Sequence, residues 1–134
     1  MESKMVAKLS TTINKIQRLP NSSNGKTLNE FLIYMKSNGS SERHQNNNLN
    51  VLIEFSNYFD SSLTFYNISK KEQVLSFLDT KIKDSVKDPE KRWITSWNHY
   101  ITRIKLFYRW LYNKDKEMER DYWESLQGHS PVYE

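Results

Sequence analysis

Apolar residues recur at steps of three and four along most of the chain, which is the spacing of one face of an α-helix. Proline, glycine or short polar runs separate five such stretches, at roughly residues 5–18, 27–35, 41–59, 70–82 and 89–113. No segment alternates apolar and polar residues for long enough to predict a strand. The pattern therefore predicts an all-α protein, a compact bundle of four or five helices.

Residue types at the ends of these stretches favour helix termini. Thr27 with Glu30, and Ser69 with Glu72, have the spacing of a capping box, in which each side chain bonds to the other's backbone amide. Asp88 is suited to cap the last helix, because an aspartate side chain can accept a hydrogen bond from a free backbone amide of the first turn. Pro89 would then occupy the first helical position, where a backbone amide would have no partner within the helix. These residues predict helices that begin just after Thr27, Ser69 and Asp88. Asn38-Gly39 predicts a left-handed cap at the C-terminal end of the helix that passes through Met35.

The short polar segment Asn21–Gly25 predicts a linker, because it consists only of serine, asparagine and glycine. The expected organisation is an N-terminal helix with its linker over residues 1–25, a helical domain over 26–114, and an acidic tail over 115–134. On this division, the first helix packs loosely or makes contacts outside the domain.

Basic and acidic residues are unevenly distributed. The 134-residue chain has a formal net charge of +4, but residues 91–114 contain six lysines and arginines and no acidic residue. Residues 115–134 contain six acids and two bases. A segment that concentrates positive charge is typical of proteins that bind a polyanion, and it is also compatible with an ordinary solvated helix face.

Side chains of the last predicted helix divide into two faces. At about 100° per residue, an apolar stripe that includes Trp97, Ile101 and Leu111 faces the core. The opposite face combines hydroxyls, an amide, an imidazole and cations, without a carboxylate. It consists of Arg92, Thr95, Ser96, Asn98, His99, Thr102, Arg103, Lys105 and Arg109, and all of these except Asn98 and Arg109 are candidate DNA contacts. Such donors suit phosphate oxygens and base edges of DNA, whereas a face selected only for solubility usually includes Asp and Glu.

The helix expected to begin at Ser40 or Ser41 has a second polar stretch in its first two turns. Its polar residues are Arg43, His44, Gln45, Asn46, Asn47 and Asn48. Long amides near a helix N-terminus suit base edges, and the terminal backbone amides attract phosphate. The chain is rich in asparagine throughout, however, so compositional drift explains this stretch equally well.

The sequence lacks the residue patterns of common catalytic and metal sites. It has no cysteine, its three histidines lie in different segments, and it has no glycine-rich phosphate loop. We therefore expect a non-catalytic protein with no metal and no cofactor. The longest apolar run, residues 31–35, is far too short to span a bilayer, and the first residues do not form a signal peptide, so a soluble cytoplasmic protein is expected.

Two segments carry a resemblance to a known family: TLNEFLIYMKSNGSSERHQNNNLNVLIEFSNYF (27–59) and WNHYITRIKLFYRWLYN (97–113). In order and residue type they resemble the N-terminal core-binding (SAM-like) domain of tyrosine recombinases, the phage-integrase and Xer family. The second segment ends in a pattern that this family shares. Leu52, Phe55 and Phe59 lie where the family's second helix has apolar residues.

The resemblance implies that the domain forms one half of a C-shaped clamp around duplex DNA, with its second and last helices toward the major groove. Carried over by position, the residues that face the DNA are Arg43, His44, Gln45 and Asn47 on the second helix, and Thr95, Ser96, His99, Thr102, Arg103 and Lys105 on the last. It implies duplex DNA as the partner, and neighbouring recombinase protomers as further partners. The family's catalytic residues belong to a C-terminal domain that this sequence does not include. We therefore expect either a piece of such a recombinase or a stand-alone DNA-binding half from an archaeal or phage integrase.

Two other functions are compatible with the sequence. Leu106 and Trp110 interrupt the polar face of the last helix, and with Trp123 they could form the apolar patch of a helical protein–protein interaction module. An RNA-binding helical domain is less favoured, because no stacking sheet is predicted. DNA binding that weakens steeply with salt would favour the recombinase interpretation over both.

Overall fold

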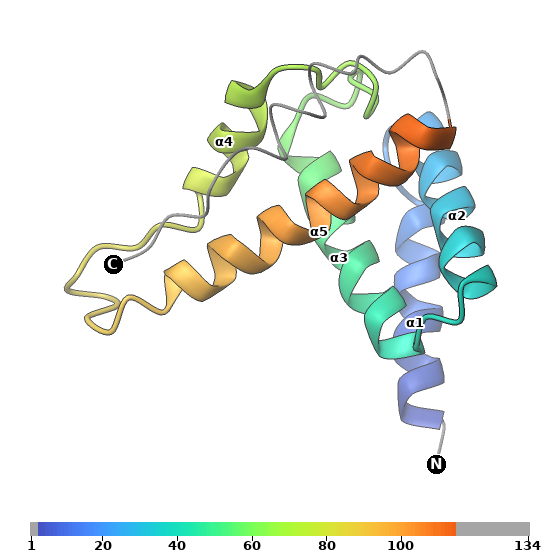
Figure 1. Ribbon diagram of the computed structural model, residues 1–134, viewed down its shortest axis with the longest axis horizontal. Coiled ribbons are helices and arrows are strands. Elements are labelled where there is room, and N and C mark those ends of the chain that lie inside the picture. The colour runs from blue at the N-terminus through green and yellow to red at the C-terminus, as the bar shows by residue number, and fades with distance from the viewer. Residues whose placement is uncertain (1–2, 115–134) are drawn as a thin grey trace. The chain divides into compact units, whose positions relative to one another are not determined.

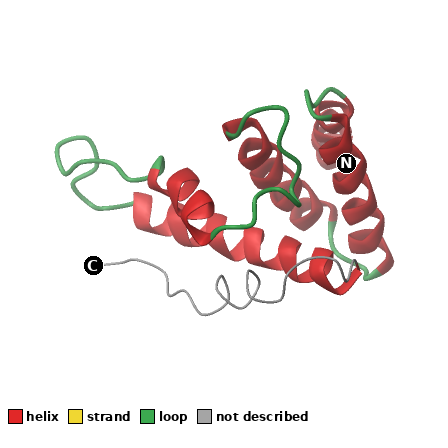
Figure 2. Ribbon diagram, turned by 90° about the horizontal axis from the view of Figure 1, so that it is seen from above, coloured by secondary structure: helices red, strands yellow, loops and turns green. Residues whose placement is uncertain are grey.

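The computed structural model describes residues 3–114, and Figure 1 shows their five helices: α1 (Ser3–Gln17), α2 (Ser22–Ser37), α3 (Glu42–Tyr58), α4 (Lys71–Asp79) and α5 (Trp93–Lys114). Figure 2 shows loops between these helices and no strand among the described residues. The predicted all-α class is therefore confirmed. The chain divides into two compact units, of which the first ends at Asn67 and the second begins at Ile68.

Helices α1, α2 and α3 pack against one another in the first unit. Each presents a stripe of apolar residues at helical spacing, and removal of these stripes from water favours their association. The buried apolar side chains of these helices include Leu9, Ile16, Leu28, Leu32, Leu49, Leu52 and Phe55. The first helix therefore belongs to the unit, and the prediction that it packs loosely is wrong.

The segment predicted to be a linker is instead the start of α2. Asn21 caps this helix, and its side chain accepts a hydrogen bond from the Asn24 backbone amide at 3.0 Å. Thr27 lies inside the helix, where its hydroxyl donates to the Ser23 carbonyl, so it does not form the predicted capping box. The predicted boundary at residue 25 is wrong because asparagine and serine are preferred both in linkers and at helix starts.

Two asparagine side chains fix this polar turn in place. Asn24 is only 1% exposed, and its Nδ2 donates to the Ser56 hydroxyl at 3.0 Å and to the Leu63 carbonyl at 3.2 Å. Its Oδ1 accepts from the Phe65 amide at 2.9 Å. Asn21 also donates to the Leu63 carbonyl, at 3.1 Å. These bonds tie the start of α2 to the loop that follows α3.

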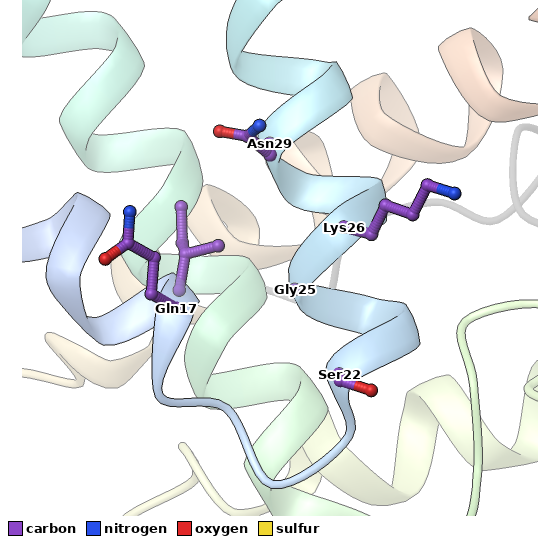
Figure 3. Close-up of a pocket in the computed structure, with 6 residues that line it drawn as sticks. Gln17, Ser22, Gly25, Lys26 and Asn29 are labelled. Atoms are coloured by element: carbon purple, nitrogen blue, oxygen red, sulfur yellow. The ribbon is translucent and has the colours of Figure 1, made fainter.

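A glycine sets the distance between α1 and α2. A Cβ atom at Gly25 would lie 2.7 Å from the Ile16 carbonyl oxygen, a separation that real Cβ atoms essentially never show. Figure 3 shows Gly25 opposite the end of α1, where Gln17 lies. The two backbones approach this closely because residue 25 has no side chain.

The connection between α2 and α3 follows the sequence prediction. Gly39 has a positive φ of 76°, a conformation that glycine adopts without steric strain. The amides of Gly39 and Ser40 donate to the carbonyls of Lys36 and Met35, which is the pattern of a Schellman cap. Ser41 then caps α3 by accepting a backbone hydrogen bond with its hydroxyl at 3.1 Å.

In the second unit, α4 packs against α5. The Phe77 and Tyr100 rings lie with their centroids 5.9 Å apart. The Gln73 side chain accepts from the Lys70 amide at 2.9 Å, so the cap of α4 is Lys70 rather than the predicted Ser69. Only one of the two bonds of a capping box forms, because the lysine side chain has no acceptor for the Gln73 amide.

The start of α5 lies later in the chain than the Asp88-Pro89 pattern predicts. Lys91 has a positive φ of 56°, which a continuous right-handed helix cannot include. The helix therefore begins only at Trp93. Asp88 still serves as a cap, because its Oδ2 accepts a hydrogen bond from the Trp93 amide at 2.8 Å.

Candidate nucleic-acid interface

One face of α5 presents polar side chains to solvent. Its uncharged or weakly basic members are exposed and recur at steps of three and four residues, so they share one side of the helix. The helix contains no acidic residue over its whole length. The α5 outer face, as we name it, consists of Thr95, Ser96, His99, Thr102, Arg103 and Lys105.

The two cations of the α5 outer face are partly buried. Burial lowers the pKa of Arg103 and that of Lys105, although an arginine remains charged in proteins. Arg103 Nε lies 2.9 Å from Nε2 of His99. Partial desolvation, followed by the charge of Arg103, lowers the pKa of His99, so its ring is neutral at pH 7 and accepts this hydrogen bond.

The candidate residues on α3 do not all reach the surface. Arg43 and His44 are exposed in its first turn, and Asn47 is partly buried. Gln45 is only 4% exposed, and its Nε2 donates to the Ser40 carbonyl at 2.7 Å. The sequence predicts Gln45 as a DNA contact, but this position of the helix faces inward, so its side chain is not part of the exposed surface of α3.

The neighbouring asparagines of α3 also stabilise the fold. The Asn46 side chain hydrogen-bonds to the Thr12 hydroxyl of α1. Asn48 is fully buried, and its Nδ2 lies 3.3 Å from the sulfur of Met35. The asparagine run that the sequence presents as recognition or drift is thus largely a set of internal contacts.

A basic pocket lies at the loop that joins α4 to α5, drawn in yellow in Figure 1. The pocket has a volume of about 290 Å³ and is lined by Lys81, Lys83, Lys87, Asp88, Arg92, Trp93 and Ser96. Sequence reasoning finds Arg92 and Ser96 but misses the three lysines. It misses them because acidic residues are interspersed with the lysines in the loop, and the sequence does not show which of these side chains line a common cavity.

Acidic side chains of this loop bond to the loop itself. Asp84 accepts from two backbone amides of the turn that follows it, at 2.8 and 3.0 Å. Hydrogen bonds, chiefly from the Arg92 amide, hold the pKa of Asp88 below its ordinary value. Glu90 forms an exposed ion pair with the Arg92 guanidinium at 2.8 Å. The carboxylates thus stabilise the turn and the start of α5, while the lysines line the pocket.

A second cavity, of about 270 Å³, lies between α1 and α2 (Figure 3). Its polar lining comes from Gln17, Ser22, Lys26 and Asn29. Lys26 is the single charged residue of this lining, and Figure 3 shows its side chain extending away from the end of α1. The cavity therefore lacks the cluster of charges that a polyanion site requires.

The apolar residues considered for protein–protein interaction are not an open patch. Leu106 and Trp110 are both partly buried. The Trp110 ring packs with its centroid 5.8 Å from that of Phe107. Trp123, the third member of the predicted patch, lies outside the described residues.

Comparison with protein-family models, with curated proteins and with solved structures finds no match to this chain. Within residues 3–114, no helix combines the length and the apolar character needed to cross a membrane. The same residues contain no group of three His, Asp or Glu side chains placed to hold a metal ion. The polar face of α5 and the basic pocket are therefore the two candidate sites of the described chain.

Proposed function

We propose that this chain binds duplex DNA without catalysing a reaction, as the core-binding (SAM-like) half of a site-specific tyrosine recombinase. The α5 outer face makes the main contact with the DNA, and Arg92, Arg43 and His44 provide further contacts. Assembly of neighbouring recombinase protomers on the same DNA belongs to this proposal.

The observation that carries the proposal is the absence of any acidic side chain on α5 together with the exposure of its polar residues. Hydroxyls and cations donate hydrogen bonds to phosphate oxygens, and a carboxylate among them would repel the DNA. Ordinary surfaces mix both signs of charge. A 22-residue helix that lacks acids is therefore better suited to a polyanion than to solvent alone.

We expect modest sequence specificity. Bidentate base recognition usually depends on Arg, Asn or Gln side chains in the major groove. Gln45 is buried and Asn47 partly so, which leaves Arg103 as the main side chain of this kind on the α5 outer face. Most of the binding energy then comes from phosphate contacts, which do not depend on sequence.

The test is fluorescence anisotropy of a labelled duplex of mixed sequence, measured at several salt concentrations. Arg109 is exposed four residues beyond Lys105, on the same side of α5. If Arg92, Arg103, Lys105 and Arg109 each neutralise about one phosphate, the affinity falls roughly tenfold for each doubling of salt. An interaction module would show little binding and no such dependence. A duplex affinity that is weak at low salt and insensitive to salt would overturn the proposal.

A charge reversal locates the contact on the helix. Lys105→Glu should lower duplex affinity at least tenfold, whereas Lys36→Glu on α2 changes the net charge equally and should have little effect. Because Lys105 is partly buried, the melting temperature of each variant is recorded beside its affinity. If Lys105→Glu unfolds the chain, Arg109→Glu at an exposed position of the same helix replaces it. Equal losses in the α5 and α2 variants would refute a contact through α5.

A further inference from the structure

The basic pocket at the loop between α4 and α5 differs in character from the α5 outer face. Its lining contains four cations and one carboxylate, so it has an excess of three positive charges. That carboxylate, Asp88, already accepts the backbone amide at the start of α5. The lining therefore has an excess of positive charge, which a bound anion would neutralise.

The four cations of the pocket lining differ in how they are positioned. The Lys81 ammonium lies 4.4 Å from the centroid of the Tyr100 ring and 5.2 Å from that of Phe77, which positions its charge by cation–π attraction. Lys83 and Lys87 are exposed. Arg92 is paired with Glu90, but both side chains of that pair are mostly exposed, so a phosphate can compete for the guanidinium.

The pocket also has an aromatic wall. Trp93 lines it and is partly exposed. An indole ring beside cations suits a ligand that has a flat ring at one end and negative charge at the other, because bases stack on aromatic side chains while phosphates bind cations. A volume of about 290 Å³ is close to the lower limit of roughly 300 Å³ for small-molecule sites, so it suits a single nucleotide.

We infer that this pocket binds one phosphorylated nucleotide, with its phosphoryl groups on Lys81, Lys83, Lys87 and Arg92 and its base against Trp93. The nucleotide is either a free nucleoside polyphosphate or the 5′-phosphorylated end of a DNA strand. The pocket lies within the second unit and does not require duplex binding by the α5 outer face.

Isothermal titration of the full chain at low salt tests the pocket with ATP, AMP, adenosine and tripolyphosphate as probes. Affinity should rise at least tenfold from AMP to ATP, adenosine should give no binding, and tripolyphosphate should bind more weakly than ATP. Tripolyphosphate that binds as tightly as ATP would overturn the nucleotide assignment, since Trp93 would then contribute nothing.

A matched pair of variants separates the pocket from general charge. Lys83→Glu with Lys87→Glu should weaken ATP binding at least tenfold at an unchanged melting temperature. The control variant, Lys36→Glu with Lys70→Glu, changes the net charge equally at exposed positions outside the pocket. Its ATP affinity should stay within twofold of that of the original chain. Equal weakening in both pairs would overturn the inference.

The source of the nucleotide is decided with short single strands that have either a 5′-phosphate or a 5′-hydroxyl. A preference for the phosphorylated strand that is lost in the Lys83/Lys87 variant identifies a strand end. ATP binding without that preference identifies a free nucleotide, and the absence of both overturns the inference. Because Lys105→Glu should leave ATP binding unchanged, failure of the pocket and failure of duplex binding are distinguishable.

Discussion

Two polar stretches, the first turns of α3 and the outer face of α5, have similar residue types and opposite roles. On α3 the polar residues are consecutive from Glu42 to Asn48, so they surround the helix and some must face inward. On α5 they alternate with a buried apolar stripe, so they share one exposed side. The comparison teaches that the spacing of polar residues, more than their chemistry, decides whether they reach solvent.

The largest effect should come from a charge placed on the inward side of α3. Asn48→Asp buries a carboxylate at a fully buried position and should lower the free energy of unfolding by about 3 kcal/mol at pH 7. Because burial raises the pKa of such a group above its unfolded value, the penalty should disappear below about pH 4. Urea unfolding at both pH values measures it. Thr102→Asp on the α5 outer face is the control and should change stability by less than about 0.5 kcal/mol.

A smaller effect should come from an acidic side chain introduced on the α5 outer face, and it should change DNA affinity rather than stability. Thr102→Glu should lower duplex affinity about tenfold, because like charges repel across a DNA interface. Asn29→Glu at an exposed position of α2 is the control. Anisotropy measures both variants, and an equal loss in both would remove the distinction between the α5 outer face and the rest of the surface.

Gln45→Ala tests whether an inward-facing polar residue of α3 contributes to stability and not to DNA affinity. This change removes the hydrogen bond to the Ser40 carbonyl and should cost about 1 kcal/mol of unfolding free energy. Duplex affinity should stay within twofold of the original. A loss of affinity without a loss of stability would place Gln45 at the DNA after all, and would show that α3 opens when it binds.

The smallest effect concerns the imidazole of the α5 outer face. Since the folded pKa of His99 lies below its unfolded value of about 6.5, its contribution to stability is present above that pH and is lost as the pH falls through the folded pKa. Protonation adds a cation beside the DNA, so duplex affinity should rise about threefold from pH 7.5 to 5.5. In His99→Gln this rise should be absent, which anisotropy at both pH values tests.

Helix existence was predictable from the sequence, and several helix ends were not. The apolar periodicity indicates all five helices, and Gly39 and Ser41 mark the turn between α2 and α3 as expected. The start of α2 was predicted too late because asparagines such as Asn21 and Asn24 are common in linkers. In the structure, Asn21 caps α2 and Asn24 is buried. Only contacts with a loop some forty residues away in the chain distinguish these two roles.

The candidate sites were predictable to different degrees. The polar face of α5 follows from one helix and its period, so the sequence alone identifies its members. The basic pocket depends on how a loop folds, with Asp84 and Asp88 bonded to backbone amides and the lysines at the cavity wall. No periodicity describes a loop, so the sequence does not show which of its five cations and three carboxylates line a common pocket.

Gly25 has a hydrogen atom in place of a side chain, and this limits which residues can be substituted at its position. Large core residues tolerate substitution when their neighbours shift to refill the volume. Here the neighbour is the Ile16 carbonyl, part of the main chain of α1, and it cannot move without moving the helix. A single added methyl group at this position would therefore force the two helices apart.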